Sequence, residues 1–275
     1  MRKETSSPFF IESVSYFNLV EVATVCREEA KIGLCFGKPG VGKTASAKRF
    51  CKWPLVEANL AAKNGIPVEP EAMMACDSLY YLPSVTVSAP RLRSDLTLIR
   101  NKFEDAISRA ITWQRPDDWA EEIQKPHVKM IIVDEAFRLK YQALEELRDL
   151  QERWEVGMLL IADPGFERSI SRMWHFAVRI AHAEELRALS DDEIVFYIDK
   201  QLEFMNLPKP PEEVYTLINW YSQGNLRSLG NLFAMIARIL KINEDVVREI
   251  TRDVVETARE MMLFGINGTL SKAPA

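Results

Sequence analysis

The chain has 275 residues, of which 47% are hydrophobic and 27% charged, and its formal net charge is −5. This length suffices for one large α/β domain with a small addition, and the acidic balance excludes attraction of polyanions through overall charge. Four cysteines without C-x-x-C spacing and only three histidines exclude a metal-ligand cluster and favour reduced thiols. No apolar run approaches the length of a membrane span, and the first residues do not resemble a signal peptide. We therefore expect a cytoplasmic protein without a membrane partner.

Five short apolar runs predict the strands of a parallel sheet. They are residues 31–36, 79–85, 128–133, 157–162 and, more weakly, 177–181. The runs are continuous rather than alternating, which is typical of strands that helices cover on both faces. The stretches between them carry helical spacing, as at Leu144, Leu147 and Leu150. The predicted fold class is α/β with a five-stranded parallel sheet.

After about Glu184 the strand signal ends and helical segments follow one another, broken by prolines and by Gly224. One of these segments has the spacing of an amphipathic helix, with apolar residues at Leu229, Leu232, Phe233, Ile236, Ile239 and Leu240. We predict an α/β core over residues 1–183, a helical domain over 184–264 and a mobile tail over 265–275.

A glycine-rich loop follows the first predicted strand. Residues 37–44 read GKPGVGKT and match G-x-x-x-x-G-K-[ST], directly before a helical segment over residues 45–50. Glycines let successive N–H groups point at a phosphate, and the helix N-terminus adds positive potential. Lys43 is expected to reach the β- and γ-phosphates, and Thr44 to offer its hydroxyl to Mg²⁺. The predicted ATP-binding residues are Gly37, Pro39, Gly40, Val41, Gly42, Lys43, Thr44 and Ala45.

Two acids end the third apolar run, in the sequence Met130-Ile131-Ile132-Val133-Asp134-Glu135. The carboxyl edge of a parallel sheet is where ligands gather, so both carboxylates are expected beside the phosphates. We predict that Asp134 holds Mg²⁺ with Thr44, and that Glu135 orients and deprotonates the attacking water. Alone, such a pair usually marks only a strand end, and the glycine-rich loop gives it meaning.

With these motifs the chain resembles a family, the AAA+ target-selecting ATPases of transposition: the phage Mu B protein and its relatives TniB and TnsC. The resemblance runs from about Phe9 to the end of the helical domain, which would be the lid of a P-loop AAA+ core. It is carried by residues 10–13 (FIES), 37–44, 133–136 (VDEA) and 144–152 (LEELRDLQE). Phe137 departs from the acidic residue often found after Asp-Glu-Ala.

The resemblance implies further catalytic residues. Asp163 falls at the sensor 1 position, where Asn or Thr is more usual, and an acid there would slow or rearrange hydrolysis; it is otherwise a turn residue before Pro164-Gly165. Arg172 falls at the arginine finger, which reaches the γ-phosphate of a neighbouring subunit, with Arg168 and Arg179 as competitors. Arg227, after Gly224-Asn225-Leu226, falls at sensor 2, where a cation couples nucleotide state to the lid.

Relatives contact DNA through loops that follow the second strand, which here is the stretch over residues 86–94. Ser88, Arg91 and Arg93 suit phosphate contacts that are independent of sequence, although they also fit a pair of solvated arginines. If many subunits line one duplex, each need neutralise only one or two phosphates, so a charge of −5 is no obstacle. Residues 53–78 exceed what this connection needs, and an interaction surface is one interpretation.

The sequence thus favours an ATP- and Mg²⁺-dependent ATPase that forms a homo-oligomer on double-stranded DNA and marks it for a transposase, together with a targeting adaptor. Two alternatives remain open. A helicase-loader ATPase shares the core but prefers single strands, and a signalling or scaffold ATPase assembles under nucleotide control without DNA.

Overall fold

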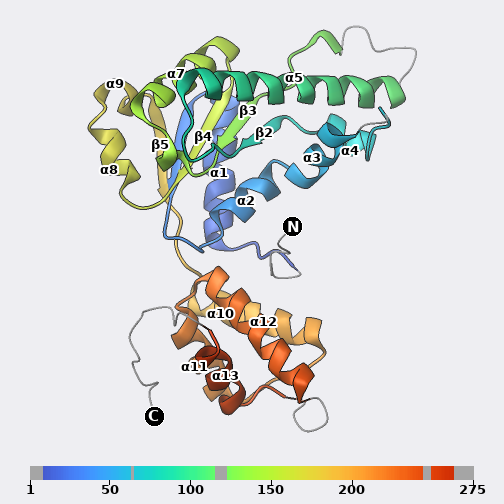
Figure 1. The fold of residues 1–275 in the computed structure, drawn as a ribbon, viewed down its shortest axis with the longest axis vertical. Coiled ribbons are helices and arrows are strands. Elements are labelled where there is room, and N and C mark those ends of the chain that lie inside the picture. The colour runs from blue at the N-terminus through green and yellow to red at the C-terminus, as the bar shows by residue number, and fades with distance from the viewer. Residues whose placement is uncertain (1–8, 63–64, 115–122, 244–248, 263–275) are drawn as a thin grey trace. The chain divides into compact units, whose positions relative to one another are not determined.

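The computed structural model describes residues 9–62, 65–114, 123–243 and 249–262 (Figure 1). The chain folds into two compact units. The sheet unit comprises residues 16–37 and 43–186, and the helical unit comprises residues 1–15, 38–42 and 187–275. The tail expected over residues 265–275 lies outside the described residues.

The sheet unit is built on five parallel strands, as predicted. Their order is β2-β3-β4-β1-β5, and the bounds are β1 (Ile32–Phe36), β2 (Ser78–Tyr81), β3 (Met130–Val133), β4 (Gly157–Ala162) and β5 (Ile180–Glu185). Strand β4 pairs with two neighbours, so its Leu160 lies opposite Leu34 of β1 at one edge and opposite Val133 of β3 at the other. All six residues of β4 are buried, which explains its uninterrupted apolar sequence.

Two predicted strands were wrong by more than two residues at an end. The second ends at Tyr81 and not at Val85, because Pro83 has no N–H with which to continue a ladder. The last lies at Ile180–Glu185, whereas Ala177 belongs to a helix. As the edge strand β5 is largely exposed, its sequence IAHAEE lacks the apolar run by which the other strands were found.

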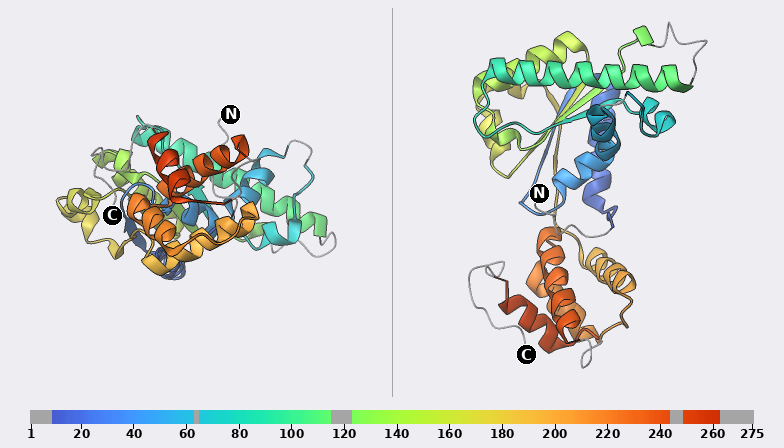
Figure 2. Two further views of the ribbon diagram at one scale, coloured as in Figure 1. Left: turned by 90° about the horizontal axis from the view of Figure 1, so that it is seen from below. Right: turned by 45° about the vertical axis from the view of Figure 1, so that its right-hand side comes forward.

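Helices cover both faces of the sheet (Figures 1 and 2). Alternate residues of the strands, such as Leu34, Ile131 and Leu160, join one apolar cluster with Phe103 and Leu144 of the helices on that face. On the other face, a Cβ at Gly33 would lie 2.6 Å from Cys26 Sγ, so glycine allows the first helix to approach. The helices of this part of the chain are α1 (Val14–Glu29), α2 (Lys43–Phe50), α3 (Trp53–Ala61), α4 (Pro70–Met74), α5 (Ala89–Gln114), the 3-10 helix η1 (Ala136–Arg138), α7 (Tyr141–Trp154), α8 (Phe166–Ser171) and α9 (Trp174–Ala177).

The helical unit contains α10 (Asp191–Met205), α11 (Glu212–Ser222), α12 (Leu226–Ile242) and α13 (Arg252–Glu260). Helix α10 begins at a capping box, in which Ser190 and Glu193 satisfy each other's backbone N–H groups. The six apolar positions predicted for one amphipathic helix are all buried on α12, which confirms that prediction. They pack with residues of α10, α11 and α13 in a core of their own.

The stretch before β2 is structured by α3 and α4. Its buried Asn59 closes this segment on itself, because its amide nitrogen donates to the carbonyls of Leu55 and Val68 while its oxygen accepts from the Val68 N–H. Part of this segment therefore belongs to the core, and an interaction surface on its exposed residues stays a prediction.

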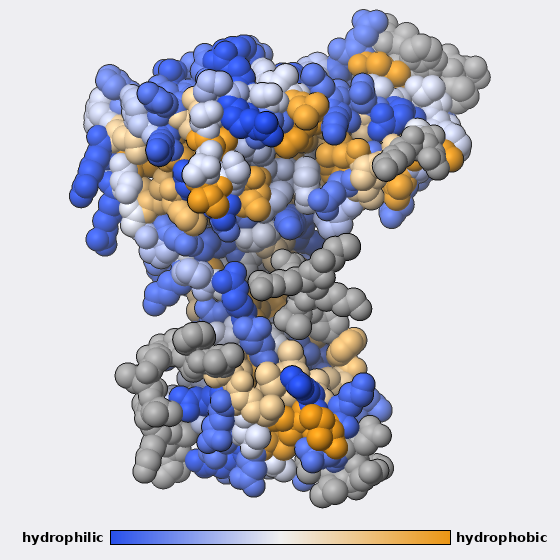
Figure 3. Space-filling model, viewed as in Figure 1, coloured by the Kyte–Doolittle hydropathy of each residue, from blue (hydrophilic) through white to orange (hydrophobic). Residues whose placement is uncertain are grey.

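Among the described residues, no helix is long and apolar enough to cross a membrane. The face in Figure 3 is mostly hydrophilic, with small apolar groups between charged side chains.

Candidate nucleotide-binding site

The glycine-rich loop leaves β1 at the carboxyl edge of the sheet. Gly37 donates its N–H to the carbonyl of Ala162 at 3.2 Å, and a Cβ on Gly37 would lie 2.2 Å from the carbonyl oxygen of Leu186. Gly40 and Gly42 have φ values of 88° and 98°, which other residues rarely adopt. The backbone conformation at these two positions therefore favours glycine. The loop leads directly into α2, and the first N–H groups of a helix have no acceptor within that helix.

Within the helical unit, the loop segment over residues 38–42 contacts the beginning of α12. Asn225 Nδ2 donates to the carbonyl of Pro39 at 2.7 Å, and the Arg227 N–H donates to the carbonyl of Gly40 at 3.3 Å. Asn225 also caps α12, because its Oδ1 accepts from the Ser228 N–H.

Lys43 is held by oxygen atoms of its own chain. Its Nζ lies 2.9 Å from Asp163 Oδ1 and also donates to the carbonyl of Gly37. The lysine side chain is 10% exposed and the aspartate side chain is 40% exposed. The structure thus places Asp163, after β4, against the lysine that was predicted to bind phosphate. One of the hydrogen bonds that the Lys43 ammonium group can donate is therefore made to the Asp163 carboxylate.

Asp134, at the end of β3, is buried and fully engaged. Its Oδ2 accepts from Thr44 Oγ1 at 2.6 Å and from the Tyr80 hydroxyl at 2.8 Å, and its Oδ1 accepts from the Glu135 N–H at 2.8 Å. The predicted pair of Thr44 and Asp134 therefore meets across two elements. Oxygen ligands of these two kinds are those that Mg²⁺ prefers, so the residues fit this ion.

Sequence reasoning missed Tyr80. Burial, and then the charge of Asp134, raise the pKa of this hydroxyl, which therefore stays protonated and donates. Its ring centroid lies 5.3 Å from Lys48 Nζ and 5.6 Å from the ring centroid of Trp53. In the sequence, Tyr80 could be noticed only as a residue with a hydroxyl group in a predicted strand. Its partner Asp134 becomes apparent only once β2 is known to pair with β3.

Glu135 lies directly after β3 in the left-handed conformation, with φ 49°. Its carboxylate pairs with Arg138, three residues later on η1. Arg138 Nη1 also donates to the carbonyl of Pro83 at 2.8 Å. The water-activating residue predicted from the sequence is thus tied through one guanidinium to the segment that follows β2, and this arginine too was missed.

The arginines predicted to sense phosphate differ in their partners. Arg172 is exposed at the end of α8 and makes no side-chain ion pair within the described part of the chain. Its competitor Arg179 pairs with Glu152, and Arg168 lies 3.7 Å from Glu167. Arg227 is exposed in the first turn of α12. Of the three candidates for the arginine finger, Arg172 is therefore the one whose guanidinium is not engaged by a carboxylate within the described residues.

Two of the three residues predicted to contact DNA, Arg91 and Arg93, lie in helix α5 and not on a loop, whereas Ser88 lies directly before that helix. Helix α5 begins at Ala89, where Ser88 Oγ accepts from the Arg91 N–H and Pro90 fits the first turn. Arg91 pairs with Asp95 at 2.8 Å, and Arg93 with Glu146 of α7. The two guanidinium groups are exposed but carry carboxylate partners.

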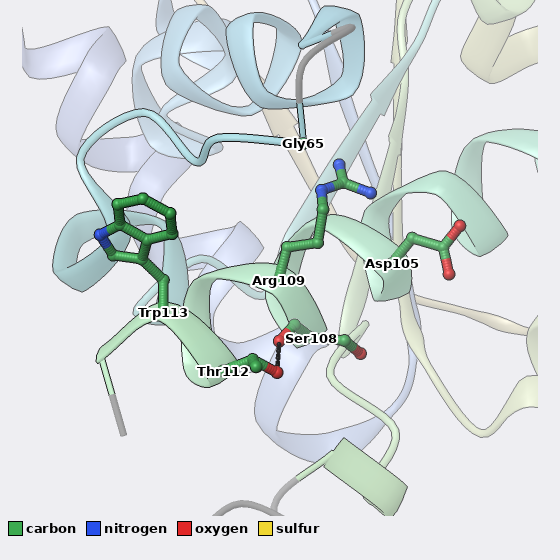
Figure 4. Close-up of a pocket in the computed structure, with 6 residues that line it drawn as sticks. All are labelled: Gly65, Asp105, Ser108, Arg109, Thr112 and Trp113. Atoms are coloured by element: carbon green, nitrogen blue, oxygen red, sulfur yellow. Dashed lines mark hydrogen bonds between the residues drawn. The ribbon is translucent and has the colours of Figure 1, made fainter. Parts of the chain in front are cut away.

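A surface cavity of about 390 Å³ lies along α5, and none of the predicted site residues lines it. Figure 4 shows Arg109 and Trp113 projecting from this helix, and Thr112 Oγ1 donating to the Ser108 carbonyl at 2.8 Å. No residue of the glycine-rich loop lines it, and that loop stays the candidate nucleotide site.

Comparisons with known proteins show the family and the fold of the chain. Residues 26–170 match a family model described as an AAA domain. A potential ATP-binding protein of Staphylococcus aureus is 30% identical over 95% of this chain and 99% of its own. The Mu-like prophage FluMu DNA transposition protein B of Haemophilus influenzae is 29% identical over 59% of this chain and 48% of its own.

Solved structures share the fold at low identity. The Thermotoga maritima RuvB Holliday junction branch migration motor has a TM-score of 0.58 and 15% identity, over 93% of this chain and 71% of that one. The ADP form of the Aeropyrum pernix ORC2 protein has a TM-score of 0.58 and 18% identity, over 92% and 70%. Together with the family match over more than half of its length, these findings show that the chain belongs to the AAA domain family of P-loop ATPases.

Proposed function

We propose that this protein is an ATPase of the transposition branch of its family, which binds duplex DNA when ATP is bound and marks that DNA for a transposase. The observation that carries the proposal is the meeting of Lys43, Thr44, Asp134 and Asp163 at the carboxyl edge of one parallel sheet. These residues come from three separate elements, and they supply a phosphate ligand, oxygen donors for Mg²⁺ and an acid at sensor 1.

In this proposal the triphosphate lies on the main-chain amides of residues 37–45, with Lys43 at its β- and γ-phosphates. Lys43 exchanges the Asp163 carboxylate for phosphate oxygens when ATP binds, because both anions need the same ammonium group. Thr44 and Asp134 hold Mg²⁺, which supplies positive charge to the phosphates when bound.

Hydrolysis uses the residues that follow the strands. The Glu135 carboxylate accepts a proton from water, the water oxygen bonds to the γ-phosphorus, and the bond from that phosphorus to the β,γ-bridging oxygen breaks to give ADP and phosphate. Arg172 of a neighbouring copy stabilises the charge on the transferring group, and Arg227 senses the γ-phosphate through the lid. ATP therefore acts as the assembly switch, and hydrolysis loosens the oligomer.

The DNA part of the proposal is supported by relatives. The FluMu protein named above is a DNA transposition protein. The resemblance to Mu B, TniB and TnsC rests on sequence motifs that include residues 133–136 and 144–152. Arg91 and Arg93 would contact phosphates from each of many subunits, so that the duplex is held without base contacts. A transposase and a targeting adaptor are the proposed protein partners.

A filter-binding experiment with the wild-type protein tests the proposal. It compares labelled duplex and single-stranded DNA of one length, each with and without ATP and Mg²⁺. We expect retention of the duplex only with nucleotide, and at least a tenfold preference over the single strand, a difference of about 1.4 kcal/mol. Preference for single strands would instead identify a helicase-loader type of ATPase, and no retention of either would remove DNA from the function.

A further inference from the structure

The turn before α12 holds Asn225 in a fixed place within the helical unit. The Leu189 N–H donates to the carbonyl of Gly224 at 2.9 Å. Gly224 has φ 70°, and a Cβ there would lie 2.3 Å from the Leu189 carbonyl oxygen, so the turn requires glycine. Directly after it, Asn225 Oδ1 accepts from the Ser228 N–H at 3.1 Å and caps α12. The side-chain amide of Asn225 is therefore oriented by its own helix.

The nitrogen of the same amide binds the glycine-rich loop. Asn225 Nδ2 donates to the carbonyl of Pro39 at 2.7 Å. Gly40 allows this approach, because a Cβ there would lie 2.2 Å from Asn225 Oδ1 and 2.7 Å from its Nδ2. The next carbonyl along the loop, that of Gly40, accepts from the Arg227 N–H at 3.3 Å. Two successive carbonyls of the loop are thus bound to the beginning of α12.

The direction of a carbonyl determines the direction of the N–H that follows it. The peptide bond between Pro39 and Gly40 is trans, and in a planar trans peptide the C=O and N–H bonds point to opposite sides. Since the Pro39 carbonyl points at Asn225, the Gly40 N–H points away from it. Successive N–H groups that point away from the protein's own acceptors are what an anion-binding loop needs.

We propose that Asn225 is a positioning residue for nucleotide binding, which holds the Pro39 carbonyl so that the Gly40 N–H faces the phosphates. Without this bond, the peptide can rotate, because Gly40 has no Cβ and adopts φ 88° as readily as other values. The loop would then have to be ordered when nucleotide binds, which lowers affinity. The inference rests on the proposed function, since it requires that the triphosphate lie on this loop.

This role differs from the one proposed for Arg227, whose side chain would sense the γ-phosphate. Asn225 acts through the backbone of the loop and needs no contact with the nucleotide. Its two hydrogen bonds can also be separated by substitution, because one is accepted by Oδ1 and the other is donated by Nδ2. A side chain that keeps an oxygen but has no amide nitrogen retains the cap of α12 and loses the bond to Pro39.

The test measures the Kd of a fluorescent ATP analogue and the melting temperature for Asn225→Ser and Asn225→Asp. Serine and aspartate cap helices about as well as asparagine, so both variants are expected to melt within about 2 °C of the wild type. Asn225→Ser is expected to raise the Kd about fivefold, or roughly 1 kcal/mol. Asn225→Asp is expected to raise it further, because its carboxylate faces the Pro39 carbonyl oxygen and adds negative charge near the phosphates.

Steady-state ATP hydrolysis supplies a second measurement. The KM of both variants is expected to rise with the Kd, while kcat stays within about twofold of the wild-type value. This pattern is that of a binding contact made equally in the ground state and the transition state. A fall in kcat with unchanged Kd and KM would place the effect in the chemical step and overturn the inference.

Thr251→Ala is the matched control. Thr251 Oγ1 accepts from the Val254 N–H and caps α13, another helix of the same unit. Its removal is expected to lower the melting temperature, because alanine is a poor N-cap, and to leave the Kd of the analogue within about twofold. The control therefore loses stability and keeps affinity, whereas the Asn225 variants keep stability and lose affinity.

The outcomes distinguish the inference from the proposed function. If the wild type binds the analogue and both Asn225 variants bind it equally well, the positioning role is overturned and the nucleotide site stands. A loss of affinity of the same size in Thr251→Ala would overturn it too, because affinity would then follow the stability of the helical unit. A wild-type protein that does not bind the analogue would contradict the proposed function itself.

Discussion

Two regions of the sheet unit contain cations expected to meet phosphate, and the structure partners them differently. At the glycine-rich loop, Lys43 is 10% exposed and binds Asp163, which is 120 residues away in sequence. At the beginning of α5, Arg91 and Arg93 are 71% and 50% exposed and pair with Asp95 and Glu146. In both regions an acid of the protein pairs with the cation. Only the Lys43 cation is itself shielded from water, because the acids are 40% exposed at Asp163 and 23% and 11% exposed at Asp95 and Glu146.

Because of this difference, we expect substitutions in the two regions to change binding by different amounts. Exposed ion pairs contribute about 0–1 kcal/mol and weaken with salt, whereas shielded pairs are screened far less. We therefore expect large effects of substitutions at Lys43 and its partner, and small, salt-dependent effects at the arginines of α5. Four substitutions, two in each region, test this contrast.

Lys43→Ala should have the largest effect, the loss of nucleotide-dependent DNA binding. Without the ammonium group the triphosphate loses a charge-assisted contact in a shielded site. Filter binding measures this with and without ATP, and Lys102→Ala, on an exposed position of α5, serves as the control. DNA retention by Lys43→Ala that still responds to ATP would break the contrast between the regions.

Asp163→Asn should tighten the binding of ATP. The amide keeps the shape of the side chain but neither holds Lys43 as an ion pair nor repels the γ-phosphate. We expect the Kd for ATP to fall roughly threefold to tenfold, as befits a partly shielded pair. Isothermal titration calorimetry measures it beside Asp105→Asn, an exposed acid on α5. Equal or weaker binding by Asp163→Asn would show that Asp163 supports the nucleotide site.

Arg91→Ala combined with Arg93→Ala should weaken DNA binding by similar factors across unrelated sequences. Each arginine that neutralises a phosphate adds about 0.9 to the slope of log K against log salt concentration, so the slope should flatten by about 1 to 2. The measurement is a salt titration of duplex binding with ATP present. An unaltered slope would exclude the beginning of α5 as the DNA contact.

Glu146→Gln should have the smallest effect, in the opposite direction. It removes the nearer carboxylate partner of Arg93 on α7, leaving only the contact with Asp149 at 4.0 Å, and so makes the guanidinium more available to phosphate. Duplex affinity is expected to rise about twofold to threefold at low salt and to approach the wild-type value as salt screens the charge. Competition filter binding measures the ratio, and a reduced affinity would show that the pair of Arg93 and Glu146 itself orders the DNA surface.

The sequence predicted the parts of the fold that local composition determines. Strand β4 has the predicted bounds because all its residues are buried and apolar, and α12 was found because its buried side recurs with the period of a helix. Strand β5 was displaced because an edge strand needs no apolar run. The beginning of α5 was missed because Ser88 and Pro90 can signal either a turn or a helix start.

A sequence motif was enough to predict that Thr44 and Asp134 lie together, as the structure shows, while their binding of Mg²⁺ and the binding of phosphate by Lys43 stay predictions. Tyr80 and Arg138 were missed because their roles lie in partners brought together by the sheet: Tyr80 meets Asp134 through the pairing of β2 with β3, and Arg138 meets the Pro83 carbonyl. No residue type or spacing announces such a contact. From the sequence, Asp163 was expected to repel the γ-phosphate, but its ion pair with Lys43 was not expected.

The most direct test is the equilibrium binding of ATP with Mg²⁺ to the purified wild-type protein, measured by calorimetry with light scattering on the same samples. We expect saturable binding of one nucleotide per chain, accompanied by growth in particle mass. A flat titration together with a mass that stays at one chain would contradict it.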